Sequence, residues 1–263
     1  MRISTIAMTT AGALAAGAIA TRVQTREIAR THPARGRIVS TSSGRLHVLD
    51  AGEGPPLLLI HGNAVTSEDW VASGLFDTLA QTHRVIAPDR PGYGHSERAR
   101  GRSWTPRKQA AAIAEMLGVL RVDPVVVVAH SLGTQIALRL ALDNPGRVAG
   151  LVLISGYYTA TPRLDSVMAG LSAAPLVGDL MRHTVSGPAG RITAPMIAAA
   201  MFAPKPVPDG YVKAVIEPSL APLQMRACSA DGFYMLGEAG RLQKRLGANS
   251  PRRWPSSPAR TTR

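Results

Sequence analysis

The segment from Val125 to Gly133, VVVVAHSLG, contains a serine placed where it can act as a nucleophile. Its four consecutive valines do not alternate with polar residues, which predicts a strand buried on both faces. A helical segment, 134–144, follows directly. A serine in the tight turn between a buried strand and a helix is held in a strained conformation with its hydroxyl exposed. The pattern therefore predicts Ser131 as the nucleophile of a covalent mechanism.

Small residues flank Ser131 on both sides. Ala129 stands where the usual Gly-x-Ser-x-Gly pattern has its first glycine, and Gly133 stands at the second. Both allow the strand and helix backbones to pass close to each other. The start of the helix leaves the Leu132 N–H available to an anion, which predicts one half of an oxyanion hole.

The segments around this turn alternate between strands and helices. The predicted strands are 37–41, 45–50, 57–60, 84–88, the valine run and 150–155, and the predicted helices are 68–80, 105–120 and 134–144. This alternation predicts an α/β fold with a doubly wound, mostly parallel sheet. Catalytic groups of such sheets lie at the carboxyl ends of the strands. Asn63, Asp89 and Ser131 all follow strand ends, so we expect their loops to converge.

Three motifs, LLLIHGNA, VIAPDRPGYGHSER and VVVVAHSLGTQIALRLAL, resemble those of α/β-hydrolase-fold enzymes and occur in the same order. The resemblance covers roughly residues 36–245. It implies that Asn63, the residue after His-Gly, donates its backbone N–H to the oxyanion beside Leu132. It also implies a helical cap after the sixth strand and no metal or organic cofactor. Haloalkane dehalogenases share the HGN form but have Asp at the position of Ser131, so dehalogenation is not expected.

A serine nucleophile of this type needs a histidine base and an acid that orients the base. The family order places both after the serine, where His183 is the only histidine. We interpret His61, His95, His130 and His183 as structural. None of the later acids ends a predicted strand: they are Asp143, Asp165, Asp179, Asp209, Glu217, Asp231 and Glu238.

The C-terminal segment from about Leu246 is rich in Pro, Ser and Arg and has no apolar periodicity. Family members continue here with two further strand–helix units. The segment is typical of translation in a shifted reading frame, and a genuine flexible tail is the alternative. We therefore expect a C-terminally truncated fold with impaired ester or acyl hydrolysis. The alternative is a non-catalytic, membrane-tethered protein that binds a hydrophobic ligand, or a truncated remnant of a hydrolase.

Nineteen uncharged residues lie between Arg2 and Arg22. A run of this length predicts either an uncleaved membrane anchor or a secretory signal with a cleavage site near Ala20. The anchor is the favoured interpretation and predicts a membrane-associated protein. Export to the periplasm or beyond is the alternative.

The 263 residues carry a net charge of +13, but residues 1–37 hold +5 of it and residues 241–263 hold +7. The remaining part is nearly neutral, so a nucleic-acid-binding face is not expected. We divide the chain into an N-terminal anchor or signal-like segment (1–35), a core (36–156), a cap (157–235) and a disordered basic tail (236–263). Met and Ala in the cap predict a small lipophilic, ester-like substrate. Cys228 is expected to pack in the cap.

Overall fold

The computed structural model describes residues 2–158 and 174–249 and contains a six-stranded sheet with the order β1-β2-β4-β3-β5-β6. The strands are β1 (Arg37–Thr41), β2 (Gly44–Ala51), β3 (Pro56–Ile60), β4 (Arg84–Pro88), β5 (Val125–His130) and β6 (Val148–Ile154). β4, β3, β5 and β6 are parallel, whereas β1 and β2 pair in antiparallel fashion at one edge. The predicted doubly wound, mostly parallel sheet is confirmed.

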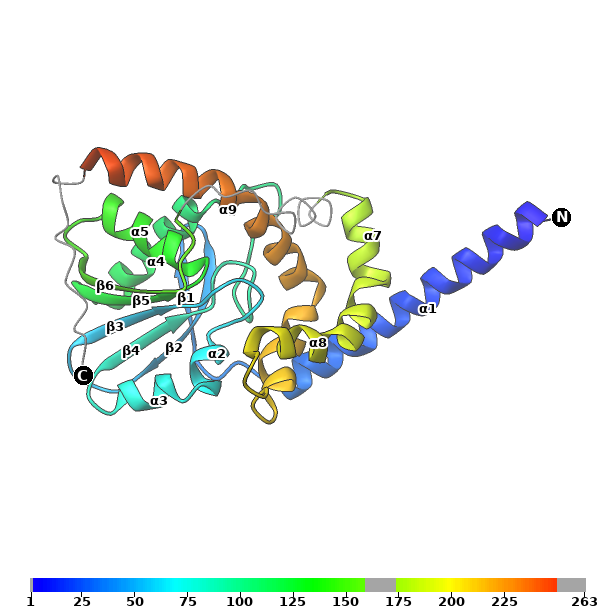
Figure 1. The fold of residues 1–263 in the computed structure, drawn as a ribbon, viewed down its shortest axis with the longest axis horizontal. Helices are drawn as coiled ribbons and strands as arrows, with labels where there is room; N and C mark the ends of the chain where they lie inside the picture. The colour runs from blue at the N-terminus through cyan, green and yellow to red at the C-terminus, as the bar shows by residue number, and fades with distance from the viewer. Residues whose placement is uncertain (1, 159–173, 250–263) are drawn as a thin grey trace.

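Helices cover both faces of the sheet (Figure 1). α4 (Pro106–Leu120) and α5 (Gly133–Asp143) pack on one face, and α2 (Glu68–Ala72) and α3 (Leu75–Ala80) pack on the other. Successive residues of β5 alternate between the two cores: Val127 and Ala129 face α4 and α5, while Val128 faces the other side. The uninterrupted valine run is explained by this two-sided burial.

The segment predicted as a single helix over 68–80 forms two short helices instead. α2 ends at Ala72 and α3 begins at Leu75. Gly74 between them has φ +72°, a left-handed conformation that interrupts an α-helix and that glycine adopts without a steric penalty.

The region predicted as the cap contains α7 (Val177–Thr184), α8 (Ser186–Phe202), two short helical turns, η1 (Val212–Ile216) and η2 (Glu217–Leu220), and the first part of α9 (Pro222–Asn249). Residues 159–173 of the predicted cap lie outside the described residues. Figure 1 shows α9 running from the cap across the helices of the sheet domain.

The predicted disordered tail from residue 236 needs correction, because α9 continues as an ordered helix to Asn249. Glu238 and Leu242 on this helix are buried, and Glu238 forms an ion pair with the buried Arg139 of α5. These contacts order a stretch that composition alone assigned to the tail. Residues 250–263 lie outside the described part of the chain.

The N-terminal segment forms α1 (Arg2–Thr31), which projects from the body at its start and packs on the cap with its second half (Figure 1). Thr21 and Gln24 are buried there, and Gly17 lies so close to α7 that a Cβ would be 2.3 Å from the Thr184 carbonyl oxygen. Glu27 pairs with Arg191 of α8 at 3.0 Å.

None of the described helices combines the length and the apolarity that crossing a membrane requires. The predicted membrane anchor in residues 3–21 is therefore not supported. The reason is compositional: Ala, Gly and Thr expose little apolar surface per residue, so an uncharged run is not necessarily a hydrophobic one. Export stays a prediction.

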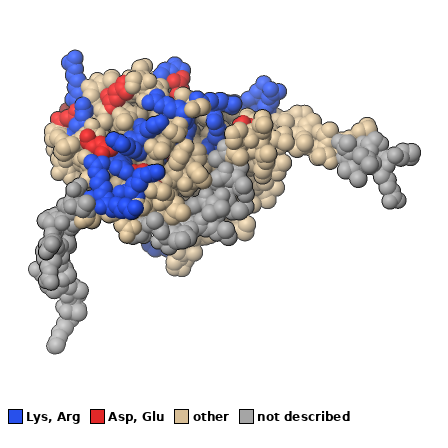
Figure 2. Space-filling view, turned by 90° about the horizontal axis from the view of Figure 1, so that it is seen from above, with Lys and Arg blue, Asp and Glu red and all other residues tan. Residues whose placement is uncertain are grey.

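Lys and Arg side chains lie over the sheet domain, with Asp and Glu side chains among them (Figure 2). Arg245 on α9, for example, pairs with Asp143 of α5 at 2.5 Å, and Arg107 of α4 approaches the same carboxylate at 3.4 Å. The basic residues of α9 are therefore partly balanced by acids of the core. The absence of a nucleic-acid partner stays a prediction.

Candidate active site

Ser131 occupies the turn between β5 and α5 with φ +51°, a conformation that is uncommon for a residue other than glycine. The turn is held by the Ser131 N–H, which donates to the Ile154 carbonyl at 2.9 Å, and by the Thr134 hydroxyl, which donates to the Ser131 carbonyl at 2.6 Å. Such strain persists only where the surrounding structure enforces it. The local geometry is that of the predicted nucleophile turn.

Two glycines bring the loop after β3 against this turn. A Cβ on Gly133 would lie 2.5 Å from the Ile60 carbonyl oxygen, so only glycine fits there. A Cβ on Gly62 would lie 3.1 Å from the Cβ of Ser131. The structure therefore brings together the loop that carries Asn63 and the turn that carries Ser131 and Leu132.

Neither the Asn63 N–H nor the Leu132 N–H donates to another group in the described part of the chain. Leu132 lies at the N-terminus of α5, where the first backbone N–H groups of a helix have no partner within the helix. The side-chain amide of Asn63, in contrast, is engaged: its Nδ2 donates to the Cys228 carbonyl at 3.1 Å, and its Oδ1 accepts from the Tyr93 hydroxyl.

His61 is fully buried between the loops, and its two ring nitrogens are both occupied. Nε2 accepts the Arg90 backbone N–H at 2.9 Å, so Nδ1 carries the proton and donates to the Gly62 carbonyl at 2.9 Å. Burial, together with the charge of Arg90, lowers the pKa of His61 to about 3. A ring with this pKa and no free nitrogen is structural.

The other three candidate histidines also lie away from the Ser131 hydroxyl, which makes no hydrogen bond within residues 2–158 and 174–249. The His130 ring packs edge-on against Trp70, with 6.5 Å between ring centroids. His95 is exposed and packs against His47. His183 is exposed beside α1.

A buried histidine–carboxylate pair that the sequence did not suggest joins β2 to the end of β4. His47 Nδ1 donates to Asp89 Oδ2 at 2.8 Å, and its Nε2 accepts the Gly36 N–H at 3.1 Å. Burial alone would raise the pKa of Asp89, but the hydrogen bonds from His47 and Ser67 hold it below its usual value. This pair faces Gly36 and Ser67 and makes no contact with Ser131.

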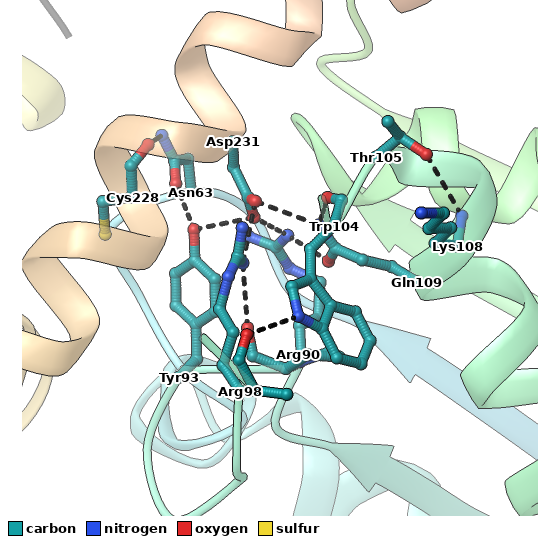
Figure 3. Close-up of polar contacts among 12 residues, drawn as sticks. Asn63, Arg90, Tyr93, Arg98, Trp104, Thr105, Lys108, Gln109, Cys228 and Asp231 are labelled. Carbon is teal, nitrogen blue, oxygen red and sulfur yellow. Dashed lines mark hydrogen bonds and ion pairs between the residues drawn. The ribbon is translucent and has the colours of Figure 1, made fainter. Parts of the chain in front are cut away.

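A second buried network joins the loop after β4 to α9 (Figure 3). Arg90 Nη1 donates to Asp231 Oδ2 at 2.7 Å, and Arg98 Nη1 donates to Asp231 Oδ1 at 3.0 Å. Gln109 Nε2 donates to Asp231 Oδ1 at 3.0 Å. The Tyr93 hydroxyl shares its single proton between Asp231 Oδ2, at 3.0 Å, and Asn63 Oδ1. Asp231 was singled out from the sequence only as an acid that ends no strand. Its partners are distant in the sequence, and no motif marks it.

The remaining acids after Ser131 also have structural partners or lie elsewhere. Glu238 and Asp143 form the ion pairs described above, and Asp179 pairs with Arg182 at 2.6 Å. Asp165 lies outside the described residues.

Within the described residues, no group of three His, Cys, Asp or Glu side chains could hold a metal ion. Burial, together with the nearby Asp231, raises the pKa of the Cys228 thiol to about 11. The thiol is therefore protonated at neutral pH and is a poor nucleophile.

An apolar cavity of about 120 Å³ borders the loop that carries Asn63, the predicted oxyanion loop. Asn63, Ala64 and Val65 line it from the core, and the cap contributes Gly190, Ala194, Ile197, Met201, Ile216, Ser219 and Leu220. No charged side chain is among these residues. The cavity suits a small apolar group.

Comparison with known proteins shows what the chain resembles. The sequence profile described as alpha/beta hydrolase fold matches residues 55–193, more than half of the chain. Haloalkane dehalogenase 2 of Mycobacterium bovis is 34% identical over 122 residues, 46% of this chain and 42% of that protein. The 2-hydroxymuconate semialdehyde hydrolase of Pseudomonas putida is 36% identical over 145 residues, 54% of this chain and 49% of that protein. These matches span about half the length of the curated relatives.

Among solved structures, a thermophilic esterase from Thermogutta terrifontis superposes with a TM-score of 0.63 at 22% identity, over 82% of this chain and 77% of that one. This likeness concerns the fold alone.

Proposed function

Because the chain belongs to the alpha/beta hydrolase fold family, we propose that it hydrolyses an ester or a related acyl bond through Ser131. The observation that carries the proposal is the strained φ of +51° at Ser131 beside the Asn63 loop. The matched curated relatives include hydrolases, which supports hydrolysis in general.

In the proposed reaction the Ser131 hydroxyl attacks the carbonyl carbon and passes its proton to water, which returns a proton to the departing alkoxide so that it leaves as an alcohol. The N–H groups of Asn63 and Leu132 stabilise the resulting oxyanion, the alcohol leaves, and water hydrolyses the acyl-enzyme. Dehalogenation is a poorer fit, because Ser131 stands where the dehalogenase pattern needs Asp. The side-chain amide of Asn63 is moreover bound to Cys228 and Tyr93.

The substrate that we propose is a small lipophilic ester. The 120 Å³ cavity beside the oxyanion loop is lined by apolar groups. For scale, a dry cavity of about 150 Å³ in another protein binds benzene. The acyl group should therefore be short and uncharged.

A second candidate is a protein that binds such a ligand without converting it. It is favoured by the finding that no described imidazole hydrogen-bonds to the Ser131 hydroxyl. A serine without a base is a weak nucleophile at neutral pH. We therefore propose that the rate of this chain is impaired, near the roughly 10³–10⁴-fold acceleration over water that binding and an oxyanion hole alone provide.

The two candidates are separated by p-nitrophenyl butyrate hydrolysis and fluorophosphonate labelling of the chain, its Ser131→Ala variant and a Ser42→Ala control. Ser42 is exposed in the turn between β1 and β2. Labelling and turnover that disappear in Ser131→Ala but survive in Ser42→Ala support acyl hydrolysis. If all three proteins show the same labelling and turnover and bind the ester saturably, the second candidate, ligand binding without conversion, is supported.

A further inference from the structure

The peptide unit between Gly62 and Asn63 is fixed from its carbonyl side. The Gly62 oxygen accepts hydrogen bonds from Arg90 Nη2 at 2.9 Å and from His61 Nδ1 at 2.9 Å. In a planar trans peptide the C=O and the N–H point in opposite directions, and this bond is trans. Holding the Gly62 carbonyl therefore sets the direction of the Asn63 N–H, the proposed oxyanion donor.

The side chain of Asn63 is fixed as well, and both of its contacts lead to α9. Nδ2 donates to the Cys228 carbonyl of α9, and Oδ1 accepts from Tyr93. The Tyr93 hydroxyl also contacts Asp231 of α9 at 3.0 Å. The donor residue is thus held through its peptide and through its side-chain amide, whose neighbours Tyr93 and Cys228 are labelled in Figure 3.

Asp231 connects these two supports. It binds Arg90 at 2.7 Å and Tyr93 at 3.0 Å through the same oxygen, Oδ2. The Arg90 guanidinium also lies 4.2 Å from the centre of the Tyr93 ring. Arg90 and Tyr93 are fully buried, so neither can exchange this carboxylate for solvent.

We propose that Arg90 and Tyr93 are positioning residues for the oxyanion hole, and that Asp231 makes their positions depend on the seating of α9 against the core. The role of the Asn63 N–H rests on the proposed function. Displacement of α9 removes the carboxylate that holds both side chains and frees the Gly62–Asn63 peptide to rotate. An error of about 1 Å in such a donor can cost up to a hundredfold in rate.

A second ion pair between α9 and the core provides a matched control. Arg139 of α5 pairs with Glu238 of α9, and both side chains are buried. This pair seats the same helix but contacts neither Gly62 nor Asn63. A second control is Tyr211, whose hydroxyl donates to Asp69 at 3.0 Å and joins the cap to α2.

The test compares Arg90→Lys with Arg139→Lys and Tyr93→Phe with Tyr211→Phe in the full chain. Lysine keeps the charge beside the carboxylate, but a single ammonium cannot replace the guanidinium at both Asp231 and Gly62. Backbone amide exchange of the peptide containing residues 61–65 is measured by mass spectrometry. The rate of Ser131 modification by a fluorophosphonate is measured on the same samples.

Arg90→Lys and Tyr93→Phe should each speed amide exchange in residues 61–65 by about tenfold and slow Ser131 modification by about tenfold. A tenfold change is close to the largest effect expected from the loss of one hydrogen bond. Arg139→Lys and Tyr211→Phe should change both readouts less than twofold. Equal effects in the test and control variants would mean that the Arg90 and Tyr93 contacts contribute only to general packing, and would overturn the proposal. Unchanged exchange in Arg90→Lys and Tyr93→Phe would overturn it as well.

The exchange measurement does not depend on catalysis. If the unmodified chain is not labelled at Ser131, the proposed hydrolysis fails, while exchange in residues 61–65 still decides whether Arg90 and Tyr93 hold the loop. If Arg90→Lys does not fold, the Tyr93→Phe and Tyr211→Phe pair decides the matter alone.

Discussion

Two buried carboxylates near the oxyanion loop, Asp89 and Asp231, are stabilised in different ways. Asp89 accepts hydrogen bonds from uncharged donors of the core: the N–H and hydroxyl of Ser67, the His47 ring and the His95 N–H. Asp231 faces two guanidinium groups, Arg90 and Arg98. Removing Asp89 leaves unpaired donors, whereas removing Asp231 leaves buried positive charge.

The difference shows what each carboxylate does for the fold. Asp89 joins groups that the sheet already brings together, because the end of β4 lies beside His47 in the middle of β2. Asp231 lies on α9 and offsets the desolvation cost of burying the Arg90 charge. Buried charge without a partner is far more costly than a lost neutral hydrogen bond. The interface between α9 and the core is therefore the more vulnerable of the two regions.

The largest expected effect is that of Asp231→Ala. Because Arg90 would be left buried without a carboxylate, the free energy of unfolding should fall by about 3–5 kcal/mol, measured by urea denaturation. Asp143→Ala is the control, since Asp143 forms its ion pairs near the surface and should cost less than about 1 kcal/mol. Equal losses of unfolding free energy in Asp231→Ala and Asp143→Ala would show that the buried ion pair contributes no more than the surface pairs.

A second prediction concerns His61, which lies between the two regions. The charge of Arg90 lowers the pKa of His61, and the charge of Asp89 raises it. Its folded-state pKa of about 3 lies below the unfolded value of 6.5, so the unfolded chain binds more protons between these pH values. The contribution of neutral His61 to the free energy of unfolding is therefore fully present above pH 6.5. It falls on acidification, by about 2 kcal/mol between pH 7 and pH 5.

Urea denaturation at several pH values measures this slope. His61→Gln, which cannot titrate, should flatten the profile between pH 7 and pH 5. An equal slope in the variant and the unmodified chain would mean that another group is responsible.

The smallest effect is expected for Asp89→Asn. The asparagine oxygen still accepts from Ser67, but its amide group faces the N–H donors of His47 and His95, so we expect a loss of about 1–2 kcal/mol. The lowered pKa of Asp89 means that its contribution is present above the usual carboxyl pKa and disappears as the pH falls through the folded value. The loss should therefore be measurable at pH 7 and shrink in strong acid. A loss as large as that of Asp231→Ala would erase the distinction between the two carboxylates.

Most of the sheet could be predicted from the sequence, because its signals are contiguous. The bounds of β1 and β4 agree with their predicted ranges, and α4 begins at Pro106, one residue after the predicted start, with Thr105 as its N-cap. The predictions for the two ends relied on composition instead. The structure does not support the membrane span predicted from an uncharged run, and part of the Arg-rich tail is an ordered helix. Composition does not reveal which residues are buried against another element.

The sequence by itself determined the turn at Ser131, since nine adjacent residues specify a buried strand, a strained serine and a helix start. It also placed the Asn63 loop at the same edge of the sheet, because parallel strands end together. Only the tertiary structure decided what holds that loop. Arg90 and Asp231 are 141 positions apart. Arg90 lies within one of the recognised motifs, but no local pattern marks Asp231 as its partner. Their pairing arises only when α9 folds across the sheet domain and two charges that could not be buried separately are buried together.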